Sequence, residues 1–431
     1  MFFQEERVLR MRDFRRSLRS DRLRLAAASV ALLVLLLLPL SRAVSQEGNA
    51  SSPPRGTISI LAYNVDNLFD AHADGTEYPE FNPTRGRWND RLYHLRLENT
   101  AKVIRDSVPG GPDVVVLEEI ENEHVLRTLA DQYLSGLGFR QMVMVPVRRS
   151  AINVGVLTRF PVTELKAHEV YTGPGHPLRN ILELHIDCAG TPLVLFACHW
   201  KSKSGGARET EQGRLLASRI IVSRVRDILR ENPAADVVVG GDLNESVDEY
   251  ERVGGAYQTA IVDLEKMPAL PAPLPRRFAQ DSIFAAETTG ELDSFAGSGQ
   301  QSDRPVVMFS PWGSVRPTPA AQSSAAQSSA QGSYWFRGTW ETIDQFLLSP
   351  GLLDERGFSF RSFKVVAPAF LLNRSGHPES WQNARSSGYS DHLPILLTLT
   401  RREDTLTRRV GTLNRRQDTL NRRKVEAGGR D

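Results

Sequence analysis

The sequence predicts an α/β fold, in which buried strands alternate with amphipathic helices. Residues 237–239 are three valines in a row, followed by two glycines, which is typical of a strand that is buried on both faces. Segments with helical apolar spacing separate this run from similar runs earlier in the chain. Polar residues, among them Asp242 and Asn244, follow directly after the strands. This pattern predicts a functional site at the strand ends.

The composition is that of an ordinary globular protein. The 431 residues are 40% hydrophobic and 24% charged, enough for one large domain or two small ones. The net charge is +2, but residues 1–24 carry a net +4 and residues 401–431 a net +5, which leaves a net −7 on the body between them. An acidic body that handles an anionic substrate needs a local basic patch or a cation.

Residues 1–43 have the pattern of an export signal. Arg-rich residues 1–24 precede an apolar run from Leu25 to Leu40, and residues 41–43 have the small-x-small pattern of a cleavage site. The apolar run is shorter than the ~20 residues that a spanning helix needs. A cleaved signal peptide and an uncleaved anchor that tethers the chain to the membrane through residues 25–40 both fit. Either one places the body outside the cytoplasm, in the periplasm or the medium.

A Ser-, Pro- and Gly-rich linker at residues 44–56 leads into the first predicted strand, residues 57–63. Asn64 and Asp66 follow it, and side chains two apart share one face of an extended strand. A second strand, residues 113–117, ends in acidic residues that include Glu118 and Glu119. Acidic residues at this point also suit the start of a solvated helix. The other elements predicted in this half are helices at 91–108 and 125–137 and strands at 139–146, 151–158, 180–187 and 191–200.

The predicted strand 191–200 carries His199 near its end, and Lys201, Lys203 and a Gly pair follow. These residues suit an anion site, and exposed loop charges explain them equally well. A long helix at 209–231 then leads to the strand that delivers Asp242 and Asn244. Those two side chains would project together from extended backbone as a catalytic pair. An Asx turn at the end of the strand is the competing interpretation.

The chain changes character at about residues 264–333, a predicted low-complexity insertion in which we expect 317–333 to be disordered. Strands are predicted again near Asp344 and at 395–399. The tail, residues 401–431, repeats a seven-residue basic pattern with one Leu per repeat, too few for a coiled coil. It is either a solvated, disordered tail or an arm that binds polyanions. The two cysteines, Cys188 and Cys198, favour buried thiols over a disulfide.

Each polar cluster follows a predicted strand, and the clusters share one chemistry. Asn, Asp, Glu and His dominate them and Cys is absent, a ligand set that suits Mg²⁺ or Mn²⁺ and not structural zinc. A hydrolytic phosphoesterase needs a metal at the phosphate, a side chain that orients water, and donors for the developing charge.

Six motifs in fixed order carry a resemblance to a known family: YNVDNLFD, LEEIEN, HWKSKSGG, GGDLNES, TIDQFLLS and YSDHLPI. The chain resembles the endonuclease/exonuclease/phosphatase superfamily, the group of DNase I, abasic-site endonucleases, sphingomyelinases and inositol-polyphosphate phosphatases. The resemblance runs from about Thr57 to Thr400, outside the 264–333 insertion. The motif sequences are similar to those of the exported bacterial nuclease-like branch.

The resemblance implies a role for each motif residue. Asn64, Asp66, Glu119 and Asp391 would lie at a Mg²⁺ site, with Mn²⁺ as an alternative, and Glu118 stands where the family usually has Gln. Among the catalytic residues, His199 would contact the phosphate, Asp242 would position the attacking water, and Asp344 would orient His392, as a base or an electrostatic stabiliser. Those that would bind substrate phosphate are Asn64, Arg179, Lys201 and Asn244.

The implied fold is a four-layer α/β sandwich, in which two mixed sheets pack face to face with helices outside, in one domain at residues 57–400. The implied activity is metal-dependent phosphodiester hydrolysis, and an exported endonuclease that takes DNA or RNA as its partner is the leading hypothesis. A phosphoesterase acting on phospholipid headgroups or inositol phosphates and a catalytically inactive binding module are the alternatives. The sequence indicates no protein partner, and we expect a monomer.

Overall fold

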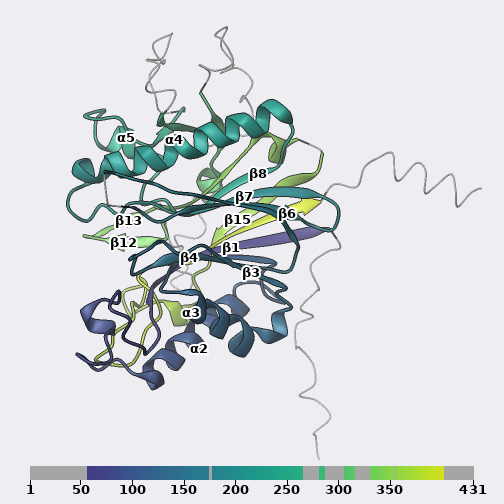
Figure 1. The fold of residues 1–431 in the computed structure, drawn as a ribbon. Helices are drawn as coiled ribbons and strands as arrows, with labels where there is room; N and C mark the ends of the chain where they lie inside the picture. The colour runs from purple at the N-terminus through teal and green to yellow at the C-terminus, as the bar shows by residue number, and fades with distance from the viewer. Residues whose placement is uncertain are drawn as a thin grey trace, which may run out of the picture. The chain divides into compact units, whose positions relative to one another are not determined.

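Two mixed β-sheets pack face to face, and helices cover their outer faces (Figure 1). This computed structural model describes residues 56–173, 177–265, 281–286, 305–315, 331–354 and 356–401, all within one unit at Ser52–Asp431. The predicted signal or anchor, most of the linker, the segment 317–330 and nearly all of the basic tail lie outside these residues. Within the described part of the chain, no helix has both the length and the apolar character needed to cross a bilayer.

The first sheet has six strands in the order β15-β16-β1-β2-β4-β3. Their bounds are β1 Thr57–Leu68, β2 Val114–Ile120, β3 Gln141–Met144, β4 Asn153–Thr158, β15 Phe358–Val365 and β16 Ile395–Arg401. β1 runs parallel to β2 and antiparallel to β16, so the sheet is mixed. β1 continues five residues beyond its predicted end, with an irregularity between Asn64 and Leu68 that turns the site residues out of the ladder.

The second sheet has eight strands in the order β5-β6-β7-β8-β14-β11-β10-β9. Their bounds are β5 Val162–His168, β6 Ile181–Asp187, β7 Pro192–His199, β8 Val237–Asp242, β9 Ile261–Asp263, β10 Ile283–Ala286, β11 Val307–Phe309 and β14 Asp344–Leu348. β10 and β11 fall inside the segment 264–333 that we predicted as an insertion. That prediction was wrong for these two stretches, because their short apolar runs pair with each other and so complete the sheet.

Three apolar layers hold the sandwich together. Alternate residues of β1 face opposite ways, so Ile60 contributes to the core between the sheets and Leu61 to the core beneath the helices. α2 (Asp90–Asp106) and α3 (Glu123–Thr128) cover the first sheet, and α4 (Ala207–Glu231) covers the second. The four-layer fold class predicted from the sequence is therefore confirmed. The structure also shows Cys188 and Cys198 as buried free thiols, as predicted.

The predicted helix at 125–137 is only partly regular. α3 ends at Thr128, a π-helical turn follows at Leu129–Tyr133, and a 3-10 turn follows at Ser135–Leu137. The regular helix therefore ends nine residues before the predicted end. The remaining described elements are short: η1 Pro79–Phe81, α5 Glu249–Arg252, η6 Pro311–Val315, β12 Tyr334–Phe336, β13 Thr339–Glu341, η8 Pro350–Leu353 and η9 Ala369–Leu371.

Candidate active site

The register of the second sheet places three predicted site residues side by side. Asp242, the last residue of β8, pairs with His199 of the parallel neighbour β7 and with Asp344 of the antiparallel neighbour β14. Gly241 precedes it at φ 129°, and a Cβ there would collide with the carbonyl of Cys198 and approach Oε1 of Glu118 to 2.7 Å. The glycine before Asp242 is therefore required by close packing.

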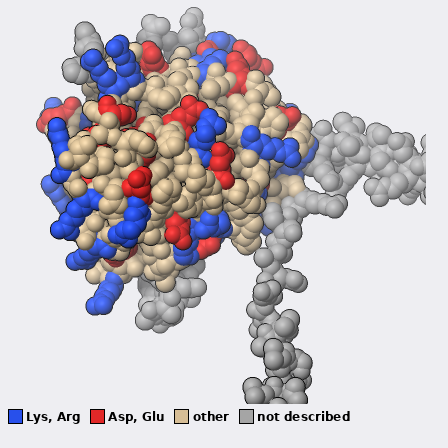
Figure 2. Space-filling view, turned by 60° about the horizontal axis from the view of Figure 1, so that its bottom comes forward, with Lys and Arg blue, Asp and Glu red and all other residues tan. Residues whose placement is uncertain are grey.

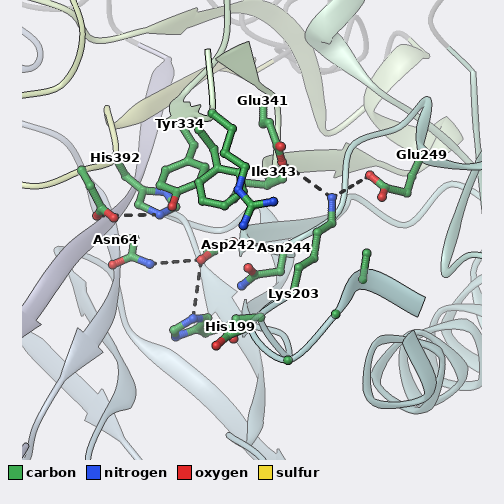
Figure 3. Close-up of a pocket in the computed structure, with 18 of the residues that line it drawn as sticks. Asn64, His199, Lys203, Asp242, Asn244, Glu249, Tyr334, Glu341, Ile343 and His392 are labelled. Atoms are coloured by element: carbon green, nitrogen blue, oxygen red, sulfur yellow. Dashed lines mark hydrogen bonds and ion pairs between the residues drawn. The ribbon is translucent and has the colours of Figure 1, made fainter. Parts of the chain in front are cut away.

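Asp242, on the second sheet, also bonds to a side chain from the first sheet (Figure 3). Asn64, on β1 of the first sheet, donates a hydrogen bond from Nδ2 to Oδ2 of Asp242 at 3.0 Å and another to Oε1 of Glu119 at 3.3 Å. His199 Nε2 lies 3.5 Å from Asp242 Oδ2 and 3.9 Å from Glu119 Oε1. Side chains more than 100 residues apart in the sequence therefore share one pocket.

The side chain of His392 is held by a carboxylate on β14 of the second sheet. Its Nδ1 lies 2.8 Å from Oδ2 of Asp344, and that same oxygen accepts a hydrogen bond from the Ser333 hydroxyl at 2.5 Å. The Tyr334 ring stacks on the imidazole, with centroids 4.5 Å apart. The structure thus brings Asp344 and His392 together, as the resemblance implied. It adds two residues that sequence reasoning missed: Ser333, which bonds to Asp344, and Tyr334, which stacks on His392.

Three of the predicted site residues have left-handed backbone. Asp66, Glu119 and Asn244 have φ of 55°, 67° and 52°, a region that non-glycine residues rarely adopt. Such conformations cost on the order of 1–3 kcal/mol each and gather at functional sites. The folded surroundings therefore hold these side chains in directions that regular strands would not give them.

The predicted extended geometry of Asp242 and Asn244 was wrong. The strand ends at Asp242, and the N–H of Asn244 bonds to Oδ1 of Asp242 at 2.8 Å, which is an Asx turn. Asn64 and Asp66 repeat the arrangement, with the Asp66 N–H 3.0 Å from the Asn64 side-chain oxygen. The competing interpretation of the sequence was therefore right about the backbone, yet both members of each pair still lie at the site.

The acids of the site are buried without enough compensating positive charge. Burial, together with the neighbouring carboxylates Asp391 and Asp66, raises the pKa of Glu119 to about 7. Burial and Asp391 raise the pKa of Asp66 to about 6, and burial and Asp344 raise that of Asp242 to about 6. Each of these groups is short of a cation at neutral pH.

The two histidines of the site are driven to opposite protonation states. Burial, and then the Arg179 guanidinium, lower the pKa of His199 well below its usual value. Burial also opposes the charged form of His392, but Asp344 and Asp391 outweigh it and raise the pKa of His392 well above the usual value. The pocket therefore pairs a neutral imidazole with a protonated one.

The acids Asp66, Glu119 and Asp391 offer oxygen ligands of the kind that Mg²⁺ and Mn²⁺ accept. Burial, and then the charges of neighbouring acids, raise the pKa values of Asp66 and Glu119. Among the described residues that line the pocket or contact it, Asp242, Asp344 and His392 have ligand atoms that all lie within 4.8 Å of one another. In this group, Nδ1 of His392 is already bonded to Asp344.

The predicted phosphate-binding cations occupy different places. Arg179 donates from Nε to the carbonyl of His199 at 3.0 Å and from Nη2 to that of Trp200, so it braces the strand end behind His199. The Lys201 ammonium contacts the oxygens of Ser202 and Ser204 in its own loop. Neither residue lines the pocket, whereas Lys203 does. Asn244 lines the pocket and donates to the Trp200 carbonyl at 3.3 Å.

Glu118, which stands where the resemblance predicts Gln, points into the protein beneath the site. Both of its carboxyl oxygens are buried and lack a hydrogen-bond partner among the described residues. Burial, with Asp344 and Asp242 nearby, raises its pKa well above the usual value. The protonated acid is close in shape and charge to the Gln it replaces, which removes the extra negative charge expected from the sequence.

A known protein family matches part of this chain. Residues 59–255 match the model of the Endonuclease/Exonuclease/phosphatase family. This match confirms the resemblance that the order of the motifs predicts.

Individual relatives are distant. Tyrosyl-DNA phosphodiesterase 2 of Gallus gallus is 25% identical over 152 residues, which are 34% of this chain and 36% of that protein, so the match spans about a third of the curated relative. Among solved structures, TDP2 from Caenorhabditis elegans has a TM-score of 0.45 at 15% identity and covers 80% of this chain and 74% of that one. A mannosyl-6-phosphatase of Bacteroides thetaiotaomicron has a TM-score of 0.42 at 13% identity and covers 80% and 99%.

Proposed function

We propose that the protein is a metal-dependent phosphodiesterase that hydrolyses DNA or RNA. The observation that carries the proposal is one pocket in which the carboxylates of Glu119, Asp242 and Asp391 adjoin His392, and Asp344 holds that imidazole. The similarity to a tyrosyl-DNA phosphodiesterase supports nucleic acid as the substrate class.

Each side chain has a defined task in such a reaction. Asp242, whose Oδ2 faces Asn64 and His199, accepts a hydrogen bond from the attacking water and orients it. His392 presents a positively charged imidazole to the phosphate, where it stabilises the growing negative charge. Asn244 offers amide hydrogens to the same group. A divalent cation bound at Glu119 and its neighbours would neutralise the phosphate and the leaving oxygen.

The face shown in Figure 2 has no continuous basic surface, because its Lys and Arg are interspersed with Asp and Glu. Contact over a long stretch of duplex would need many phosphate-neutralising cations together. This face is therefore not suited to such contact.

A phosphorylated polyol is the second candidate substrate. The pocket has a volume of about 690 Å³, and Glu249 and Glu341 line it beside Lys203. Carboxylates accept hydrogen bonds from hydroxyl groups, which an inositol phosphate offers in number and a DNA strand does not.

A substrate panel separates these candidates. Purified protein without residues 1–43 is incubated with plasmid DNA, single-stranded DNA, RNA, sphingomyelin and inositol hexakisphosphate, with Mg²⁺, with Mn²⁺ and with chelator. We expect strand cleavage that chelator abolishes and added metal restores. Release of phosphocholine or inorganic phosphate with every nucleic acid intact would replace the nuclease proposal with the alternative.

We also propose that the protein is exported, from the pattern of residues 1–43. N-terminal sequencing of the protein recovered from the periplasm or medium of an expressing Gram-negative host tests this. A mature end near Val44 supports a cleaved signal, and recovery of the intact chain in the membrane supports an anchor. Intact chain in the cytoplasm would contradict export.

A further inference from the structure

A small aromatic hairpin forms one wall of the pocket. β12 (Tyr334–Phe336) and β13 (Thr339–Glu341) pair in antiparallel register. Arg337 and Gly338 connect them with φ of 48° and 90°, the positive values of a tight two-residue hairpin turn. Tyr334, Phe336, Arg337 and Glu341 line the pocket together with His392 and Asp242.

The two faces of this hairpin have different surroundings. Trp335 packs inward, stacked on His377 at a centroid distance of 3.7 Å and against Trp340 at 5.4 Å. Tyr334 and Phe336 point to the other face, because side chains alternate along a strand. Phe336 is 43% exposed, one of three large hydrophobic side chains exposed among the described residues. The contacts of Trp335 hold the hairpin in position, and the Phe336 ring on the other face is exposed and lines the pocket.

The open face is a row of planar groups that begins at the catalytic histidine. Tyr334 stacks on His392 at 4.5 Å, Phe336 stacks on Tyr334 at 5.9 Å with an interplanar angle of 16°, and the Arg337 guanidinium lies 5.0 Å from the Phe336 ring. Figure 3 shows Tyr334 beside His392 at the mouth of the site. A flat group next to the scissile phosphate would thus meet a flat surface.

The opposite wall supplies polar contacts and holds the hairpin in place. Lys203 lies 2.7 Å from Glu249 and 3.6 Å from Glu341 of β13, and Arg252 lies 3.7 Å from Glu341. The loop from Ser202 to Ala207 lines the pocket between these groups. These ion pairs tie the hairpin to the loop after β7 and to α5.

We propose that the Tyr334–Phe336 face binds the nucleobase next to the scissile phosphate, and that the preferred substrate is therefore single-stranded nucleic acid or an unpaired strand end. This inference rests on the proposed function. A base is free to stack on a protein ring only when it is unpaired and unstacked. A cation over the outer ring adds affinity for the neighbouring phosphate.

The polar tip of the hairpin argues against a lipid occupant. Its turn residues, Arg337 and Gly338, and the adjacent Thr339 give no apolar surface for insertion between acyl chains. The single exposed ring, Phe336, faces the pocket instead. A flat, polar-edged base fits these surroundings better than an acyl chain does.

An oligonucleotide with one missing base tests the inference. A 5′-labelled single strand of about 20 thymidines, with one abasic residue in the middle, is cleaved under single-hit conditions and separated on a gel. We expect cleavage at the phosphate beside the abasic residue to fall about 10-fold or more below cleavage elsewhere on the strand. In Phe336→Ala this local loss should shrink to within about 2-fold, and in Phe336→Trp it should remain.

A matched control separates this effect from general loss of an exposed ring. Tyr171→Ala removes another exposed aromatic side chain that does not line the pocket, and it should keep the wild-type gel pattern. Uniform cleavage across the abasic residue in the wild type, or an unchanged pattern in Phe336→Ala, overturns the base-binding inference and leaves the nuclease proposal standing. No cleavage of any strand, with release of phosphate from a lipid or polyol, overturns both.

Discussion

Two buried clusters of acids and histidines in this protein are made from the same residue types and have opposite electrostatics. In the pocket, burial raises the pKa values of Asp66, Glu119 and Asp242, since each is short of positive partners. Near the edge of the second sheet, Glu183 on β6 is contacted instead by an arginine, a lysine and two histidines. The residues that contact it are Arg224, through two nitrogens at 2.9 Å, His168 at 2.7 Å, His185 at 2.9 Å and Lys166 at 3.6 Å.

This difference in pKa shifts distinguishes the candidate active site from a cluster that stabilises the fold. Burial alone would raise the pKa of Glu183, but the hydrogen bonds from Arg224 and the two histidines hold it far below its usual range. That carboxylate is satisfied within the chain, and no ligand is needed. The pocket acids lack such partners, which is a cost in stability that a bound cation would remove. The two clusters therefore differ in the partners that their buried carboxylates have, and not in the types of residue that form them.

The largest expected effect is on catalysis. Asp242→Asn and His392→Gln should each lower kcat on the best nucleic acid substrate by about 10²- to 10⁴-fold, because one loses the water-orienting carboxylate and the other the charged imidazole. Glu183→Gln should keep kcat within about 2-fold. Steady-state kinetics of the three variants measure this contrast, and a pocket variant with full activity would contradict the assigned roles.

The next effect is on stability and concerns the edge cluster. Glu183→Gln should lower the free energy of unfolding by about 2–3 kcal/mol at pH 7, because it leaves the Arg224 guanidinium without its buried carboxylate. Asp242→Asn should not lower it, since that change removes a destabilising buried charge. Urea unfolding followed by tryptophan fluorescence compares the two, and equal losses would show that the clusters do not differ.

Removing a pocket acid should stabilise the metal-free protein. Glu119→Gln is expected to raise the free energy of unfolding at pH 8 by about 1–3 kcal/mol, because the folded protein no longer has to ionise an acid whose pKa is about 7. The same urea experiment in the presence of chelator measures it. A loss of stability of that size would mean that the Glu119 carboxylate is already compensated.

The pH dependence of stability should carry opposite signs for the two clusters. The pocket acids have pKa values of about 6 to 7 when folded and near 4 when unfolded, so the metal-free protein loses stability as pH rises from about 4 through 7. Glu183 has a depressed folded pKa, so its contribution is present above pH ~4.3 and is lost as pH falls below that value. The unfolding midpoint, measured without metal between pH 3 and 8, should therefore depend less on pH in both variants. The change should appear on the alkaline side in Glu119→Gln and on the acid side in Glu183→Gln.

The sequence predicted the fold class and the strand-end residues because local pattern and motif order encode them. Asn64, Glu119, His199, Asp242 and His392 all lie where strand ends meet. The backbone at Asp66, Glu119 and Asn244 was not predictable, since left-handed conformations there are imposed by packing between sheets. The phosphate-binding roles expected for Arg179 and Lys201 stay predictions. Their contacts with backbone carbonyls were not predictable, because a charge pattern does not show which groups a long side chain will reach.

The contacts that sequence reasoning missed are those made across the fold. Ser333 bonds to Asp344 and Tyr334 stacks on His392, and both residues lie at or just after the end of a segment whose composition predicted disorder. The aromatic residues just after that segment were the one available signal. The Glu183 cluster was missed for the same reason, since its members come from β5, β6 and α4.

Titration of Mn²⁺ into the metal-free protein tests the central claim most directly. Isothermal titration calorimetry of the wild type, Glu119→Gln and Glu183→Gln compares an uncompensated acid with a compensated one in the same chain. We predict one tight site in the wild type, the same site in Glu183→Gln, and at least 10-fold weaker binding in Glu119→Gln. Equal binding by all three proteins, or none by the wild type, would contradict the assignment of the pocket as a metal-dependent phosphodiesterase centre.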